Sequence, residues 1–214
     1  QVRLEQVRDI TRFLTRPPLE SPRSVVVIEG AETMAEAAAN GLLKTLEEPG
    51  NATVILLAPN LSALLPTLVS RCQCIPFKRL SLTLMATVLA TQGCGEILNA
   101  PVILALAQGS PGQAIAAWQQ WESLPPDLVT TVNAPPQTLR AALGLAQHIT
   151  KALDTEAQLW LVDYLQQLYW QRQASAKALH AFEQARLHLR RFVQPRLVWE
   201  VTLMAIAQDR GSRF

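Results

Sequence analysis

The triplet Ser70-Arg71-Cys72 places a permanent cation between a hydroxyl and a thiol. A guanidinium stays charged at every physiological pH, and its forked N–H donors suit phosphate oxygens or a carboxylate. An arginine of this kind, taken alone, is most often a surface residue after a helix, and Glu47 and Glu48 are its candidate ion-pair partners. The triplet therefore allows either a phosphate contact or a simple surface pair.

Nucleophilic catalysis by Cys72 is not expected. A catalytic thiol needs a base or another group that favours the thiolate. The histidines of the chain all lie much later in the sequence, at His148, His180 and His188. Cys72 and Cys74 are one residue apart, a spacing that fits neither a disulfide framework nor a C-x2-C zinc half-site. We therefore expect reduced thiols, with Ser70 and Cys72 shaping the turn around the arginine and no metal site.

The elements that must position this triplet form an α/β region. The expected order is a helix over 3–16, a strand over 25–28, a helix from 33 to 48, a strand over 53–58 and a helical turn over 61–65. Continuous β-branched runs are typical of strands covered on both faces of a parallel sheet. Thr33 and Glu36 have the spacing of a capping box, which would begin the second helix. The fold class is therefore α/β in this region.

The remainder of the chain is predicted to be all-α. Short helical segments separated by glycine and proline fill residues 80–124, and longer ones fill residues 137–214. The proline-rich stretch 125–136 lies between them. We therefore expect a small three-helix unit, a linker and a helical bundle.

The composition excludes several classes of protein. The 214 residues are 49% hydrophobic and 17% charged with a net charge of +2, which predicts a folded chain rather than a disordered one. No apolar run is long enough for a membrane span, and no leader precedes the first helix, so we expect a cytoplasmic protein without a membrane partner. The charge is too small to indicate nucleic acid, so such a contact must rest on where the arginines lie.

Four strings and a later turn identify a family. They are VVVIEGAETM (25–34), AANGLLKTLEEP (38–49), TVILLAP (53–59), LVSRCQCIPF (68–77) and GSPGQAI (109–115). In this order and spacing they resemble the clamp-loader branch of the AAA+ family. The resemblance implies the C-terminal part of a RecA-like ATPase domain over 1–79, a helical lid over 80–124, a linker over 125–136 and a collar over 137–214. In that family the collars assemble into a five-membered ring.

The resemblance also implies a function. The chain would be a non-hydrolysing clamp-loader subunit of the replicative DNA polymerase III holoenzyme, which loads a sliding clamp onto primer–template DNA. Arg71, supported by Ser70 and Cys72, would act in trans as an arginine finger toward ATP and Mg²⁺ held by a neighbour. The chain would not be an enzyme in its own right, but part of a DNA-directed DNA polymerase, a nucleotidyltransferase complex.

The residues expected for ATP hydrolysis in cis are missing. An active Walker B strand ends in Asp followed by Glu, whereas this strand ends in Glu29-Gly30. Glu32 lies too far along the backbone to replace the lost carboxylate and is expected to be a solvated charge at a helix start. Gly112 stands where the lid of the family carries an arginine. No Walker A loop occurs, although in the family that loop lies upstream of residue 1. We therefore expect no cofactor bound by this chain.

Contacts with DNA and with other subunits remain expectations. Arg8, Arg12 and Arg16 share one face of the first predicted helix, where they would contact DNA phosphates or simply face solvent. Lys44 lies within a helix and is expected at a surface or an interface rather than in a phosphate-binding loop. The implied partners are tau/gamma-type and delta subunits in a hetero-pentamer, the sliding clamp and primer–template DNA.

Two other functions stay open. The chain is alternatively a tau/gamma-type motor subunit that hydrolyses ATP, against which Glu29-Gly30 and Gly112 argue. The second alternative is a helical scaffold with a vestigial ATPase fold, in which Arg71 has no role at a neighbouring site.

Overall fold

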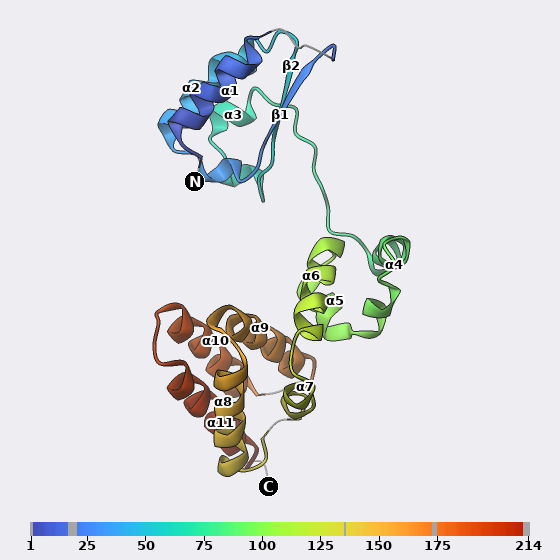
Figure 1. Cartoon of the computed structure of the whole chain (residues 1–214), viewed down its shortest axis with the longest axis vertical. Helices are drawn as coiled ribbons and strands as arrows, with labels where there is room; N and C mark the ends of the chain where they lie inside the picture. Colours follow the sequence, from blue (N-terminus) through green and yellow to red (C-terminus); the bar gives the residue numbers. More distant parts are fainter. Residues whose placement is uncertain (1, 17–20, 135, 173–174, 212–214) are drawn as a thin grey trace. The chain divides into compact units, whose positions relative to one another are not determined.

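The computed structural model describes residues 2–16, 21–134, 136–172 and 175–211, with side chains up to residue 208 in the last helix. The chain falls into two compact units, Gln1–Phe77 and Lys78–Phe214 (Figure 1). Each unit is described by itself.

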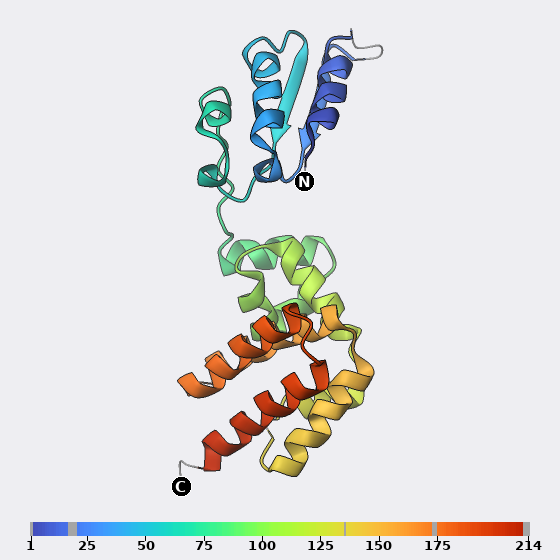
Figure 2. The same cartoon turned by 90° about the vertical axis from the view of Figure 1, so that its left-hand side faces the viewer.

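The first unit is built on two parallel strands. β1 (Ser24–Ile28) pairs with β2 (Ala52–Leu56) in a register that sets Ser24 opposite Ala52 and Ile28 opposite Leu56. The predicted parallel strand pair is therefore confirmed. Helices α1 (Leu4–Leu14) and α2 (Glu36–Glu47) pack against each other on one side of the sheet (Figures 1 and 2). The remaining elements are η1 (Ala31–Thr33), η2 (Leu61–Ala63) and α3 (Pro66–Val69).

Only one face of the sheet is covered within the described residues. Ile28 is buried with Val7 and Leu42 beneath the two helices. Val25 and Val27 point to the other face, and each is 56% exposed. Side chains alternate between faces along a strand, so a single helical layer covers only every second residue. The prediction of strands covered on both faces is therefore not met in the described part of the chain.

Two local predictions in this unit are wrong. Thr33 does not form a capping box, because its hydroxyl donates to the Gly30 carbonyl at 2.8 Å and the residue belongs to η1. Ala35 is the N-cap of α2 instead. Helix α1 ends at Leu14, so Arg16 lies beyond the helix on which it was predicted. In both cases a local turn occupies residues that the sequence pattern assigned to an α-helix.

All regular elements described in the second unit are helices. Its elements are α4 (Leu82–Thr91), η3 (Gly95–Asn99), α5 (Pro101–Ala107), α6 (Pro111–Glu122), α7 (Pro126–Val132), α8 (Leu139–Ala152), α9 (Thr155–Gln171), α10 (Ala176–Arg190) and α11 (Pro195–Gly211). Most of the longer helices start with a Ser, Thr or Asp side chain that accepts a backbone N–H of the first turn. These caps are Ser81, Ser110, Thr138, Asp154 and Ser175.

The core of this unit surrounds a buried tryptophan. The indole N–H of Trp199 in α11 donates to the side-chain oxygen of Gln158 in α9 at 2.9 Å, and both residues are buried. The amide of Gln158 in turn donates to the Leu153 carbonyl at 2.8 Å. The polar atoms of this pair are thus satisfied inside the apolar core, as burial requires.

The stretch 125–136 is not a plain linker. Residues 126–132 form helix α7, and its Leu128 and Val132 are buried in the main core. His148 of α8 also pairs with Asp127 of α7 at 2.9 Å. One of the prolines that suggested a linker instead occupies the first turn of this helix. The N–H groups of a first turn have no partner within the helix, so the missing N–H of proline costs no helical hydrogen bond. The further division of this unit into lid and collar stays a prediction.

No helix in the described ranges combines the length and apolarity needed to cross a bilayer.

Candidate functional site at Arg71

The end of helix α3 fixes the backbone of Arg71. Pro66 occupies the first helical turn, and Leu68, 1% exposed, anchors the short helix in the unit. Ser70 caps the C-terminus, and the Arg71 N–H donates to the Leu68 carbonyl at 3.1 Å. The helix therefore ends at Val69, and the turn that closes it fixes the backbone of Arg71.

The side chain of Arg71 is held by three neighbours. Its Nε and Nη2 both lie 2.6 Å from one carboxylate oxygen of Glu47, the last residue of α2. Its Nη1 donates to the Thr67 carbonyl at 3.1 Å and to the Ser70 hydroxyl at 3.3 Å. The Ser70 hydroxyl donates to the same Thr67 carbonyl at 3.1 Å. These contacts join the ends of α2 and α3 through one guanidinium.

The guanidinium keeps part of its donor capacity. The Arg71 side chain is 34% exposed and that of Glu47 is 49% exposed, so water reaches the pair. A guanidinium has five N–H donors, and the contacts with Glu47, Thr67 and Ser70 use four of them. Within the described part of the chain, at least one donor therefore remains for an acceptor outside the unit.

The two nearby cysteines do not form a reactive pair. Burial raises the pKa of the Cys72 thiol, and the Cys74 thiol raises it further. The Cys74 thiol lies 3.9 Å from the Cys72 carbonyl. A raised pKa keeps Cys72 protonated near neutral pH, which disfavours nucleophilic attack. The structural role of Cys72 stays a prediction.

The end of strand β1 offers one exposed carboxylate followed by a left-handed glycine. Glu29 is exposed, and Gly30 has φ +64°. The Ala31 N–H donates to the Leu57 carbonyl at 3.0 Å, which ties the turn to the end of β2. There is room for a Cβ atom at Gly30, but residues other than glycine avoid its left-handed backbone conformation. The backbone here is therefore that of a glycine position.

Glu32 differs from its prediction as a solvated charge. It is partly buried in η1, and its Oε2 has no hydrogen-bond partner among the described residues. Glu32 belongs to this short 3-10 turn rather than to the start of a regular helix.

The lid-like turn belongs to the second unit. Gly109 has φ +82°, and a Cβ there would lie 2.7 Å from the Leu80 carbonyl oxygen. Only glycine fits this close approach, in which the Leu80 N–H donates to the Gly109 carbonyl at 2.9 Å. Gly112 lies in the first turn of α6 with nothing within 4 Å of an added Cβ. The turn thus requires glycine at position 109, whereas position 112 has room for a side chain.

The remaining predicted cations are all exposed. Arg8 and Arg12 are exposed on α1, and Arg12 lies 3.4 Å from Asp9. Arg16 is exposed beyond the end of that helix. Lys44 is exposed near the end of α2. Their DNA and interface roles stay predictions.

The structure thus brings Ser70 and Arg71 together with Glu47, a partner that the sequence offered as an alternative. The Thr67 carbonyl was missed, although the four-residue spacing from Thr67 to Arg71 is a helical contact distance that could have revealed it. The described residues contain no group of three or more His, Cys, Asp or Glu side chains that could hold a metal ion. Whether the chain binds a cofactor is untested, so the expectation of none stays a prediction.

The fold matches a known structure. Over 98% of this chain, it is similar to the crystal structure of a DNA polymerase III gamma subunit-related protein from Thermotoga maritima, with a TM-score of 0.57, 15% sequence identity and 80% of that chain covered. The two therefore share a fold, a small parallel α/β unit followed by helices.

Sequence comparison gives the family. Residues 83–206 match the family model "Cyanobacterial DNA polymerase III delta prime, C-terminal domain", and residues 1–81 match "DNA polymerase III, delta subunit". The chain therefore belongs to the DNA polymerase III delta-prime family, and the clamp-loader resemblance seen in its motifs is confirmed.

Two curated relatives agree with this assignment. DNA polymerase III subunit delta' of Pseudomonas aeruginosa is 43% identical over 115 residues, 51% of this chain and 34% of the relative. The subunit delta' of Haemophilus influenzae is 38% identical over 122 residues, 55% of this chain and 36% of the relative. The chain thus spans about a third of the length of the curated relatives that it matches.

Proposed function

We propose that this chain acts in a clamp loader of DNA polymerase III as a subunit that does not hydrolyse ATP and that offers Arg71 to ATP bound by a neighbouring subunit. The observation that carries the proposal is the state of the guanidinium. It is anchored on one side by Glu47 and the Thr67 carbonyl, is one-third exposed and keeps a free donor.

The contacts around Arg71 suit a residue that acts on a partner's substrate. A side chain already fixed in direction loses little rotamer freedom when a phosphate approaches. Its delocalised charge then stabilises the negative charge that develops on the transferred phosphoryl group. Glu47 positions the guanidinium, and Ser70 closes the turn beneath it. A lysine would lack the planar fork that lets Arg71 hold Glu47 while one N–H stays available for a phosphate.

The end of β1 supports a non-hydrolysing role. Water activation needs a second carboxylate after Glu29, and the backbone at Gly30 has the left-handed conformation that disfavours one. This argues against the alternative of a tau/gamma-type motor. Binding of a fluorescent ATP analogue to this chain alone, followed by product formation, would favour the motor.

The partners follow from the same proposal. Residues 137–214 would contribute to a collar that joins tau/gamma-type and delta subunits in a hetero-pentamer. The sliding clamp and primer–template DNA would be met by the assembled loader, with Arg8, Arg12 and Arg16 as candidate phosphate contacts.

The test is the clamp- and DNA-stimulated ATPase of motor and delta subunits assembled with the full-length form of this chain. Arg71→Ala is compared with the matched control Arg23→Ala, another exposed arginine of the first unit, after gel filtration shows equal assembly. An arginine finger raises the rate of hydrolysis about 10³- to 10⁵-fold at the site it serves. Total ATPase activity should therefore fall by the fraction of hydrolysis that this one site contributes. Equal activity of both variants would make Arg71 a structural partner of Glu47 and favour the scaffold alternative.

A further inference from the structure

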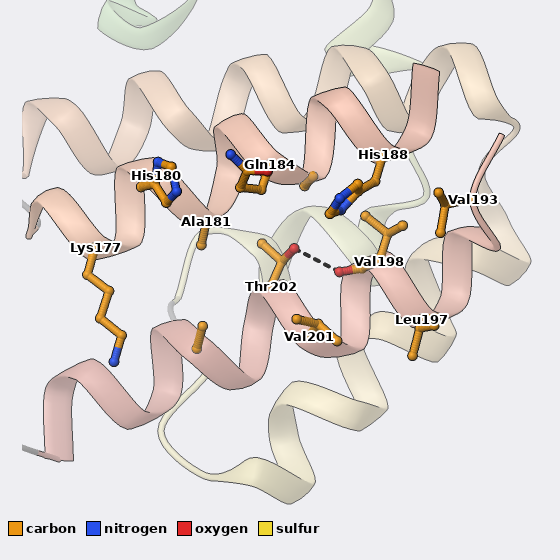
Figure 3. Close-up of a pocket in the computed structure, with 12 residues that line it drawn as sticks. Lys177, His180, Ala181, Gln184, His188, Val193, Leu197, Val198, Val201 and Thr202 are labelled. Carbon is orange, nitrogen blue, oxygen red and sulfur yellow. Dashed lines mark hydrogen bonds between the residues drawn. The ribbon is translucent and has the colours of Figure 1, made fainter. Parts of the chain in front are cut away.

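Helices α10 and α11 enclose an elongated groove on the second unit. Its volume is about 480 Å³. The α10 side of the groove is lined by residues at regular helical spacing. They begin with Lys177 at one end and reach His188 near the other (Figure 3). Eleven residues of helix span about 16 Å. The groove is therefore about three helical turns long.

The floor and the α11 side of the groove are apolar. The groove is lined by Ala181 and Ala185 of α10 and by Leu197 and Val201 of α11. Leu197 is 52% exposed and Val201 is 55% exposed, so both are open to a partner. The hydroxyl of Thr202, drawn in Figure 3, donates to the Val198 carbonyl at 2.7 Å and offers no unsatisfied donor. Short alanine side chains between longer ones create the depression.

Cations lie at both ends of this groove. Among the lining residues that the structure describes, Lys177 supplies the formal charge, His180 and His188 add polar rings, and none is a carboxylate. The exposed Arg190 and Arg191 follow His188 at the end of α10. Two acids that adjoin lining residues in the sequence are paired with arginines, Glu183 with Arg186 and Glu200 with Arg196.

We propose that the α10–α11 groove binds a short amphipathic helix of a partner protein whose apolar side chains are flanked by carboxylates. An apolar face laid along a helix-lined groove is a recurrent mode of peptide recognition. The basic rim selects acidic flanks, since opposite potentials favour one partner and repel the other sign. The proposal is independent of the role of Arg71, because every lining residue belongs to the other unit.

The shape favours this occupant over others. A helix with leucines at positions i, i+4 and i+7 fills the length of the groove. The exposed Leu197 and Val201 leave the α11 side open, whereas small-molecule sites usually bury most of the ligand surface. A second copy of this chain would bring the same basic groove against itself. Such a face-to-face arrangement would place like charges together.

The experiment measures fluorescence anisotropy of labelled synthetic peptides with the whole chain. The first probe is a helix-forming peptide of about four turns with leucines on one face and glutamates beside them. A second peptide carries lysines in place of the glutamates, and a third carries serines in place of the leucines. Lys177→Glu and Leu197→Gln are the groove variants. Lys151→Glu and Leu143→Gln are their controls on α8, exposed positions outside the groove.

The proposal expects the acidic leucine peptide to bind more tightly than the other two. Each groove variant should weaken this binding about tenfold, a loss typical of a central interface contact, and each control should change it less than about twofold. Binding should also weaken as salt is added. Failure of the acidic peptide to bind, equal effects of groove and control variants, or preference for the lysine peptide would overturn it. Self-association in ultracentrifugation that only the groove variants abolish would assign the groove to a second copy and overturn it too.

Discussion

Replacing Glu47 by glutamine should loosen Arg71 without unfolding the unit. The substitution keeps the shape of the side chain but removes the charge that two guanidinium nitrogens approach at 2.6 Å. Hydrogen bonds to charged groups contribute about 1.5–3 kcal/mol when they are shielded from water. Here the two side chains are 34% and 49% exposed, and exposed pairs typically contribute only about 0.2–1 kcal/mol. We therefore expect a loss of at most about 1 kcal/mol in the free energy of unfolding of this unit.

The assay must observe the first unit specifically. All five tryptophans of the chain lie in the second unit, so tryptophan fluorescence does not report on the ends of α2 and α3. Hydrogen exchange read by mass spectrometry on peptides of α2 and α3 measures local opening directly. A double-mutant cycle of Glu47→Gln and Arg71→Ala then isolates the coupling between the two side chains. The same cycle in about 1 M salt, where screening acts over about 3 Å, should give a smaller coupling.

Two results would refute this reasoning. A coupling free energy of zero at low salt would mean that Glu47 does not hold Arg71 in solution. A coupling above about 3 kcal/mol that salt does not change would mean that the pair is shielded from water and closed to a partner.

Three further predictions concern the core, the turn before α6 and the thiols. Trp199→Phe leaves a buried amide oxygen without its donor and should lower the free energy of unfolding by about 1–3 kcal/mol, measured by urea denaturation with circular dichroism. Gly109→Ala, which sets a Cβ 2.7 Å from a backbone oxygen, should cost at least about 1–3 kcal/mol in the same assay, whereas Gly112→Ala should cause no comparable loss. Because its pKa is raised, Cys72 holds less thiolate at any given pH, so its alkylation by iodoacetamide should be slower at pH 8 than that of the exposed Cys74 and should accelerate as pH rises.

Sequence patterns predicted the elements of the first unit better than their ends. The β-branched run before Glu29 identified β1, because a strand buried on one face still needs apolar residues at every second position. Thr33 was misplaced because its hydroxyl can either accept a backbone N–H as a helix cap or donate to a nearby carbonyl, as it does to Gly30, and only the fold decides between the two. The prolines near residue 126 suggested a linker for a similar reason, since proline ends one helix as readily as it begins the next.

The candidate site was only half predictable. The Arg71 triplet was visible in the sequence, and Glu47 was one of two equivalent acids until the fold set it at the end of α2 beside α3. The α10–α11 groove left no motif. Its signal is the alternation of alanine with longer side chains on one face of α10, and this pattern becomes a groove only once α11 is packed beside it.

The most direct test of the central claim is single-turnover hydrolysis of ATP bound to the assembled loader, followed by rapid quench. This measurement separates the chemical step from nucleotide binding. If Arg71 acts on a neighbour's ATP, Arg71→Ala should slow hydrolysis at one site by about 10³-fold or more while ATP affinity and assembly change little, and Arg23→Ala should behave as the unchanged subunit. Equal hydrolysis rates at every site in the Arg71→Ala loader would contradict the claim and leave the arginine as the partner of Glu47 alone.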